Sequence, residues 1–142
     1  MDSERVLALD LGSKRVGLAI SSPLGNEPFP LPFLPFKNAA QLIADLRKIA
    51  GEKGVRRIVV GLPVSLNETL GEQARRCKNL SKKIAAELKI PVELFDESFT
   101  TKEAEEILIG ELNLSRQKRQ KLKDSLAACL LLRSYLQSGK NS

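Results

Sequence analysis

Residues 6–20 read VLALDLGSKRVGLAI and indicate the centre of the fold. Two apolar runs flank a short polar turn, which is the pattern of a buried β-hairpin. The first run is apolar at consecutive positions, so it indicates a central strand that is buried on both faces. Asp10 interrupts this run, and an ionised carboxylate there is costly unless it is paired or coordinated. Asp10 therefore either caps the turn at Gly12 or serves a function.

Outward from the hairpin, strand and helix patterns alternate along the chain. Residues 28–35 predict an irregular edge strand, because proline cannot donate to a central ladder. The other expected strands cover 57–60 and 92–95, and the expected helices cover 39–50 with Asn38 as N-cap, 72–88, a segment capped by Thr100 or Thr101, and 115–136. This order predicts an α/β fold in which an antiparallel hairpin leads into a parallel section. Residues 1–137 form one expected domain, with a frayed tail at 138–142.

The composition narrows the class of protein. The chain has 142 residues, of which 42% are hydrophobic and 28% charged, and these values exclude a disordered or fibrous protein. The absence of histidine excludes a Ser-His-Asp triad and a histidine-based zinc site. The net charge of +6 favours a polyanionic partner.

Other sequence features bear on location and on redox chemistry. No apolar run is long enough to span a bilayer, and the N-terminus shows no secretory leader pattern. We expect a cytoplasmic protein with no membrane partner, present as a monomer or a weak homodimer. Cys77 and Cys129 lie in apolar helical patterns and are interpreted as buried, inert thiols.

Acidic residues at three places lie where apolar residues are expected. Beside Asp10, the pair Asp96 and Glu97 follows a predicted strand, and neighbouring strand residues point to opposite faces, so only one of the pair shares a site with Asp10. Asp124 lies at the edge of an apolar helical run, where the alternative is stabilisation by the helix dipole. Converging carboxylates would bind Mg²⁺ or Mn²⁺, and two such ions can act together on a phosphodiester.

Basic residues lie close in sequence to two of these carboxylate positions. A solvated helix face is the alternative for any one group, but together they suit contact with a phosphate backbone. Aromatic residues make up 4% of the chain and do not interleave with the charge, which argues against a base-stacking platform. A loop over residues 61–71 would present N–H groups to a phosphate. The residues expected to bind nucleic acid are Lys14, Arg15, Arg75, Arg76, Lys82, Lys118 and Lys121.

Four segments, in this order, resemble the motifs of the YqgF family, also called RuvX. They are LALDLGSKRVGLA at 7–19, VVGLP at 59–63, FDESFTT at 95–101 and DSLAA at 124–128. The family comprises Holliday-junction-resolvase-like proteins assigned to maturation of pre-16S rRNA. The resemblance implies a ribonuclease H-like fold, with a mixed five-stranded sheet flanked by helices.

The resemblance also implies a site. Asp10, Glu97 and Asp124 would be the catalytic carboxylates that bind two Mg²⁺ or Mn²⁺ ions, and the family motif selects Glu97 over Asp96. The implied activity is a metal-dependent endonuclease that cuts structured RNA, with the 5′ end of pre-16S rRNA as the expected substrate. Two departures from the family pattern are Ser98, where an arginine is usual, and Asn67-Glu68, where an Asp-Gly pair is usual.

Three alternatives remain open at this point. The same site chemistry permits a deoxyribonuclease that resolves branched DNA. Ser98 favours a non-catalytic nucleic-acid-binding factor in ribosome assembly or transcription. The segment Asp10–Ser13 also resembles the first phosphate loop of actin-like nucleotide-binding proteins, but a chain of 142 residues leaves no room for their second lobe.

Overall fold

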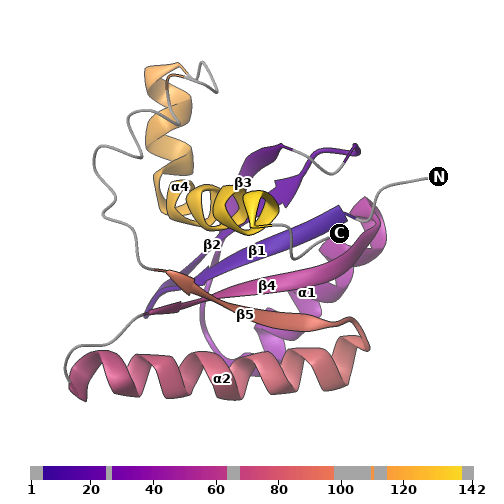
Figure 1. Ribbon diagram of the computed structural model, residues 1–142, viewed down its shortest axis with the longest axis vertical. Coiled ribbons are helices and arrows are strands. Elements are labelled where there is room, and N and C mark those ends of the chain that lie inside the picture. The colour runs from indigo at the N-terminus through magenta and orange to yellow at the C-terminus, as the bar shows by residue number, and fades with distance from the viewer. Residues whose placement is uncertain (1–4, 25–26, 64–67, 98–109, 111–114, 139–142) are drawn as a thin grey trace.

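The computed structural model describes residues 5–24, 27–63, 68–97, 110 and 115–138. In this part of the chain, five strands form one sheet and three helices pack on it (Figure 1). The strands are β1 (Arg5–Leu11), β2 (Arg15–Ser21), β3 (Pro28–Pro35), β4 (Val55–Pro63) and β5 (Val92–Glu97). The helices are α1 (Ala39–Lys53), α2 (Glu68–Leu88) and α4 (Arg116–Gln137). The helix expected after Thr100 or Thr101 lies outside the described residues.

The sheet has the strand order β3-β2-β1-β4-β5. β2 is antiparallel to both β1 and β3, whereas β4 is parallel to both β1 and β5. The predicted mixed sheet, with an antiparallel hairpin and a parallel section, is therefore confirmed. Because β1, β4 and β5 run in the same direction, their carboxyl ends meet at one edge of the sheet (Figure 1). We call this edge the carboxyl edge.

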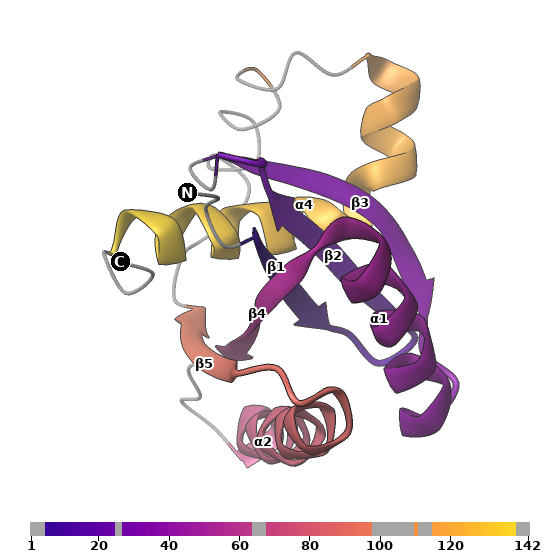
Figure 2. The same cartoon turned by 90° about the vertical axis from the view of Figure 1, so that its right-hand side faces the viewer.

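Strand alternation divides the buried residues of β1 between two cores. Leu7, Leu9 and Leu11 belong to the core that α1 and α2 cover. Val6 and Ala8 belong to the second core, which α4 covers on the opposite face of the sheet (Figure 2). Even-numbered residues of β1 therefore face α4. Asp10, which interrupts the apolar run, lies on this face as well.

The edge strand β3 contains a bulge that α4 fills. Val16 pairs with Leu34 but Leu18 pairs with Leu31, so β3 accommodates one residue more than β2 between these pairs. At the gap, the Oγ of Ser125 accepts a hydrogen bond from the Leu18 N–H at 3.1 Å and donates one to the Leu31 carbonyl at 2.5 Å. Ser125 is fully buried. One hydroxyl thus satisfies two backbone groups that the bulge leaves without a ladder partner.

We expect Ser125→Ala to lower the free energy of unfolding by about 1–3 kcal/mol, because it leaves a buried N–H and a half-buried carbonyl unpaired. Urea denaturation measures this change. Ser138→Ala is the matched control, since that exposed serine lies at the end of the same helix and its loss should cost about 0.5 kcal/mol or less. Equal destabilisation by the two variants would contradict the assignment of Ser125 to the bulge.

Two strands are longer than the sequence pattern predicts. The expected spans were 57–60 and 92–95, whereas β4 and β5 continue to Pro63 and Glu97, which pair with each other. Hydrogen bonds to a neighbouring strand override the weak local strand propensity of glycine and acidic residues. Asp96 and Glu97 consequently lie within β5 at the carboxyl edge rather than after the strand.

The second helix begins earlier than predicted. It starts at Glu68, one turn before the expected start at residue 72, and includes Gly71. One glycine near a helix end costs only about 1 kcal/mol, which packing of the helix outweighs. The predicted loop over 61–71 is therefore wrong at both ends, because 61–63 belong to β4 and 68–71 to α2. Residues 64–67 lie outside the described part of the chain.

Hydrogen bonds define the start of α1 and the end of α4. The Asn38 side chain accepts a hydrogen bond from Gln41 N–H at 2.8 Å, which confirms it as the N-cap of α1. Ser138, which we expected in the frayed tail, donates its N–H to the Ser134 carbonyl and closes α4. Residues 139–142 are not among those described. Within the described residues, no helix combines the length and the apolar character needed to cross a membrane.

Two titratable side chains of α4, both in the core between this helix and the sheet, are held in their protonated forms. Burial raises the pKa of the Cys129 thiol to about 12. Burial and a hydrogen bond with Glu93 raise the pKa of Tyr135, and the guanidinium of Arg57 opposes this shift. Within the described residues, Cys77 and Cys129 are both buried and neither forms a disulfide, which confirms the prediction for the cysteines. Because the nucleophile of a cysteine is its thiolate, Cys129 is inert near neutral pH.

Candidate active site

Asp10 lies on the α4 face of the sheet, near the carboxyl end of β1, and pairs with Gly17 of β2. Asp10 is half-buried and lines a hollow of about 440 Å³. Two glycines in the lining add no side chains, so they leave room above the carboxylate. The lining residues are Asp10, Gly12, Ser13, Lys14, Arg15 and Gly17.

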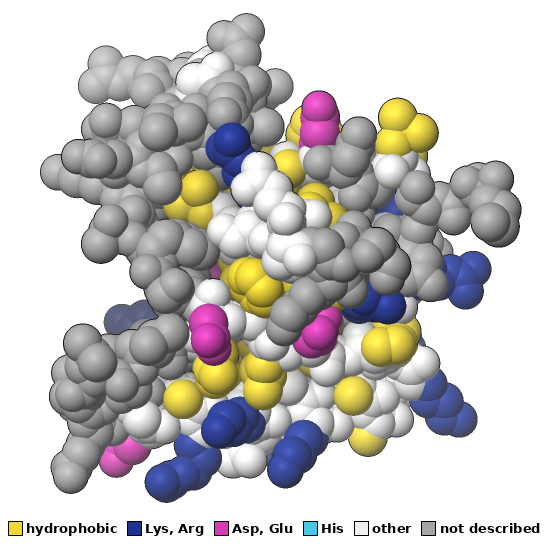
Figure 3. Space-filling model, in the orientation of Figure 1, with side chains coloured by type: hydrophobic (Ala, Val, Ile, Leu, Met, Phe, Trp, Pro, Cys, Tyr) yellow, Lys and Arg dark blue, Asp and Glu magenta, His cyan; other side chains and the backbone are white. Residues whose placement is uncertain are grey.

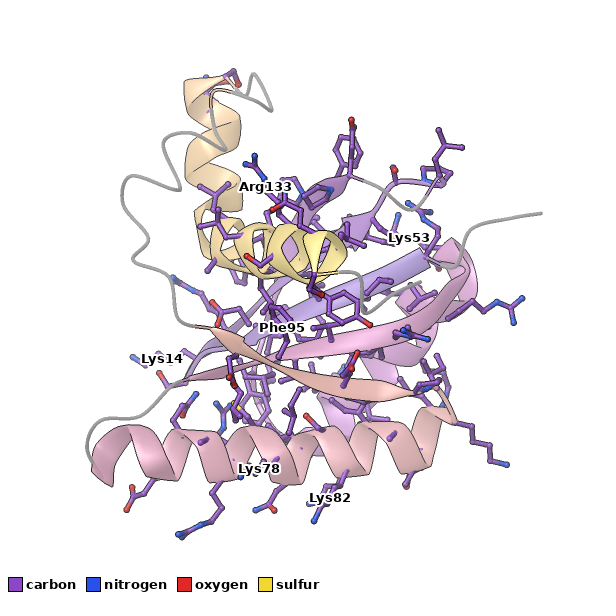
Figure 4. All side chains as sticks on the ribbon, viewed as in Figure 1. Lys14, Lys53, Lys78, Lys82, Phe95 and Arg133 are labelled. Atoms are coloured by element: carbon purple, nitrogen blue, oxygen red, sulfur yellow. The ribbon has the colours of Figure 1, made fainter. Side chains whose placement is uncertain are left out.

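The turn between β1 and β2 requires glycine at position 12. The Gly12 N–H donates to the Arg15 carbonyl at 2.9 Å, and a Cβ added to Gly12 would lie 2.6 Å from that carbonyl oxygen. This close approach holds the exposed side chains of Lys14 and Arg15 at the mouth of the hollow. The Arg15 guanidinium lies 5.2 Å from the centre of the Phe33 ring, which favours a cation–π contact. Figure 4 shows Lys14 at the carboxyl edge.

We expect Gly12→Ala to reduce the nuclease activity that the resemblance implies by about tenfold or more and to lower stability by about 1–3 kcal/mol, because the new Cβ displaces the Arg15 carbonyl. Steady-state cleavage and urea denaturation measure the two effects. Gly110→Ala is the control, because a Cβ at that exposed helical position meets no atom within 4 Å. The control should leave activity unchanged and raise stability by about 0.5–1 kcal/mol. Full activity in Gly12→Ala would contradict a role for this turn.

Two side chains of α2 fix the end of β1 from the opposite face. The Nε2 of Gln73 donates to the Leu11 carbonyl at 2.7 Å, and Nη1 of Arg76 donates to the same oxygen at 3.4 Å. The Arg76 guanidinium lies 4.6 Å from the centre of the Phe36 ring. Its Nη2 is buried and has no hydrogen-bond partner within the described part of the chain. Sequence reasoning missed Gln73, because nothing in the local pattern distinguishes it from a solvated helix residue.

Strand register assigns a face to position 97. Phe95 belongs to the core under α4, so position 97 shares that face, which is also the face of Asp10. Asp96 belongs to the opposite face and is exposed. The side chain of Glu97 lies outside the described part, so its distance from Asp10 stays a prediction.

Position 124 lies in α4 directly before the serine that fills the bulge. Ser125 contacts Leu18, which follows Gly17, the β2 partner of Asp10. The backbone at position 124 therefore lies over the part of β2 that is next to Asp10. The side chain of Asp124 is not among those described, so its role as a ligand also stays a prediction.

The predicted nucleic-acid contacts have different surroundings. Lys14 and Arg15 are exposed at the hollow, and Arg75 and Lys82 are exposed on α2. Figure 3 shows basic side chains gathered over α2, and Figure 4 shows Lys82 pointing away from the sheet. Arg76 is half-buried against Leu11 and does not lie on this outer surface. The side chains predicted for α4, Lys118 and Lys121, lie outside the described part.

The chemistry of the hollow fits a divalent cation. A half-buried carboxylate offers the oxygen ligands that Mg²⁺ and Mn²⁺ prefer, and the bare backbone of Gly12 and Gly17 leaves space beside it. Among the described side chains, no three acidic or sulfur ligands come together. Of the three predicted metal ligands, Asp10 is the one whose side chain the structure describes.

Solved structures define the class of this fold. RuvC of Thermus thermophilus in complex with a Holliday junction substrate matches with a TM-score of 0.65 at 18% identity, covering 96% of both chains. The resolvase of fowlpox virus in complex with Holliday junction DNA matches with a TM-score of 0.60 at 11% identity, covering 94% of this chain and 97% of that one. The class is that of the ribonuclease H-like α/β proteins with a resolvase fold.

Sequence comparison gives the family. The profile of RuvX, described as Holliday junction resolvase, matches residues 4–138. A Clostridium novyi protein named "Putative pre-16S rRNA nuclease" is 39% identical over 134 residues, covering 94% of this chain and 98% of its own length. A Thermosynechococcus vestitus protein of the same name is 42% identical over 131 residues, covering 92% and 86%. The chain belongs to the RuvX family, which places it among the nucleases, the hydrolases of phosphodiester bonds.

Proposed function

We propose that this protein is a metal-dependent endonuclease that hydrolyses structured RNA, with the 5′ end of pre-16S rRNA as its substrate. The observation that carries the proposal is the half-buried Asp10 carboxylate in a hollow whose mouth holds Lys14 and Arg15. A carboxylate that can bind a cation and two positive side chains that can bind phosphate meet there. The name of the curated relatives supports precursor rRNA as the substrate.

Asp10, Glu97 and Asp124 would hold the metal. All three positions lie on the α4 side, two in β1 and β5 of the sheet and one in α4 itself. When bound, two Mg²⁺ or Mn²⁺ ions supply Lewis acidity and a lowered pKa for a water molecule at the scissile phosphate. The donor set of three carboxylates suits these hard cations.

The chain's own residues bind and orient the substrate. Lys14 and Arg15 neutralise backbone phosphates at the hollow, which positions the chain for cleavage without reading its bases. The cation–π contact with Phe33 limits the conformations of Arg15 and so reduces the entropy lost on binding. Arg15 thus supplies a guanidinium beside the site in a chain that has Ser98 where the family usually has arginine.

A direct test compares two substrates with the same preparation of protein. One is an RNA that carries the 5′ end of pre-16S rRNA, and the other is a four-way DNA junction, which the description of the RuvX family favours. We expect Mg²⁺- or Mn²⁺-dependent cleavage of the RNA to be faster than cleavage of the junction. The reverse order would replace the RNA assignment with a junction-resolving activity. Salt-sensitive RNA binding with no cutting under any metal would instead support a non-catalytic binding factor.

A further inference from the structure

A second basic hollow lies at the end of the sheet opposite the carboxyl edge. Its volume is about 630 Å³, and it lies between the ends of α1 and α2 and the starts of β4 and β5. Three cations and no acidic residue line it, over an apolar floor. The lining residues are Arg47, Ala50, Gly51, Gly54, Val55, Arg56, Leu88, Lys89, Ile90 and Pro91. Gly51 and Gly54 face open space, so no side chain there obstructs the hollow.

The helix ends account for Arg47, which also lies 3.9 Å from the Glu87 carboxylate, but not for Arg56 and Lys89. Positive charge near a helix C-terminus commonly compensates free carbonyls. In α1, the Ala50 carbonyl accepts from the Gly54 N–H and the Lys53 carbonyl from Arg5. In α2, the Ala85 carbonyl accepts from the Lys89 N–H and the Glu87 carbonyl from Arg47, so neither the Arg56 nor the Lys89 side chain is needed there. Within the described part of the chain, the exposed side chains of Arg56 and Lys89 have no hydrogen-bond or ion-pair partner. Both are available to a ligand.

The backbone at Lys89 gives an independent indication. Both helices that border the hollow end in a left-handed residue, Gly54 at φ 70° after α1 and Lys89 at φ 56° after α2. Glycine adopts this conformation freely, whereas a residue with a Cβ pays about 1 kcal/mol for it. A lysine therefore occupies a position where glycine would be more stable, and strain of this kind concentrates at functional positions.

A row of cations connects the two ends of the molecule. Arg75, Lys78 and Lys82 are exposed at spacings of three and four residues, which places them on one face of α2, and Lys89 continues the row. α2 begins on the side of the carboxyl edge and ends at the second hollow (Figures 1 and 4). From Val55 at the hollow to Pro63 at the carboxyl edge, β4 spans about 26 Å at 3.3 Å per residue. This span is less than one turn of a nucleic-acid duplex.

We propose that the second hollow, through Arg56 and Lys89, binds backbone phosphates of the duplex stem of the RNA whose scissile phosphate lies at Asp10. The inference rests on the proposed function and adds to it a minimum length of substrate. Phosphate contacts of this kind fix the position of a duplex and carry no sequence information. The protein would therefore distinguish long stems from short ones.

The test measures binding of two RNA hairpins by fluorescence anisotropy in EDTA, so that cleavage does not intervene. One stem has about 6 base pairs, which cannot reach across 26 Å at 3.4 Å or less per pair, and the other has about 16. We expect Lys89→Gly and Arg56→Ala each to weaken binding of the long stem about threefold and to reduce its salt dependence by about one phosphate contact. The short stem should be affected less than about twofold.

Two controls separate this inference from its alternatives. Lys37→Ala removes one exposed cation outside the hollow and should leave binding of both stems unchanged. Lys89→Gly should raise Tm by about 3 °C while it weakens binding, which a merely structural lysine would not do. If both hollow variants bind the long stem as Lys37→Ala does, this inference is overturned and the proposed function stands. If the unchanged protein binds neither RNA, the proposed function fails and the inference fails with it.

Discussion

Asp10→Asn is expected to reduce metal-dependent cleavage on the order of a thousandfold or more. The substitution keeps the shape of the side chain but removes the negative charge, so the hollow loses the anionic oxygen that can bind Mg²⁺ or Mn²⁺. A bound metal ion stabilises the transition state by several kcal/mol. Each 1.4 kcal/mol of this stabilisation that is lost lowers the rate about tenfold. Single-turnover cleavage of the precursor RNA over a series of Mn²⁺ concentrations measures the effect.

The same variant should keep its fold. The buried part of β1 is unchanged, and asparagine keeps the shape of the side chain, so Tm should stay within about 5 °C of the wild-type value. RNA binding in EDTA should also persist, because Lys14 and Arg15 remain. Cleavage at the wild-type rate by a folded Asp10→Asn protein would remove the nuclease proposal.

The second large effect is expected at position 97. Glu97→Gln should abolish cleavage to a similar extent, because position 97 shares the α4 face with Asp10. Asp96→Asn, one residue earlier, should retain activity within about twofold, because that exposed residue belongs to the opposite face of β5. The two substitutions make the same chemical change at adjacent positions of one strand. Their comparison therefore tests the direction of the side chain alone.

Metal titration adds a readout that does not depend on turnover. Isothermal titration with Mn²⁺ should show weaker or absent binding in Glu97→Gln and unchanged binding in Asp96→Asn. The opposite result, with activity and metal affinity lost only in Asp96→Asn, would move the site to the other face of the sheet. Asp124→Asn should behave as Glu97→Gln does if position 124 in α4 supplies the third carboxylate.

Local patterns predicted most elements of the fold. The hairpin, the proline-rich edge strand and the Asn38 cap each depend on a few neighbouring residues, and all three are confirmed. The strand ends were predicted less well. Pro63 and Glu97 are held in β4 and β5 by each other, and such a partner is not visible in either segment alone.

Some residues of the candidate site could likewise be identified from the sequence, and others could not. Asp10 could be recognised because a charge in an apolar run is unfavourable wherever the strand lies. Gln73 and Ser125 could not, because each acts on a backbone group far away in sequence, the Leu11 carbonyl and the bulge between β2 and β3. Their function exists only once helix and sheet are packed together.

Charge and the alternation of apolar residues are local properties, so they could be identified from the amino-acid sequence alone. Which charges share a surface depends on packing: Asp10 lies on the α4 face and Asp96 on the other, and Arg56 and Lys89 meet at one hollow. Register and packing are cooperative. A residue's face and neighbours are fixed only when distant segments pair, and no single segment contains that information.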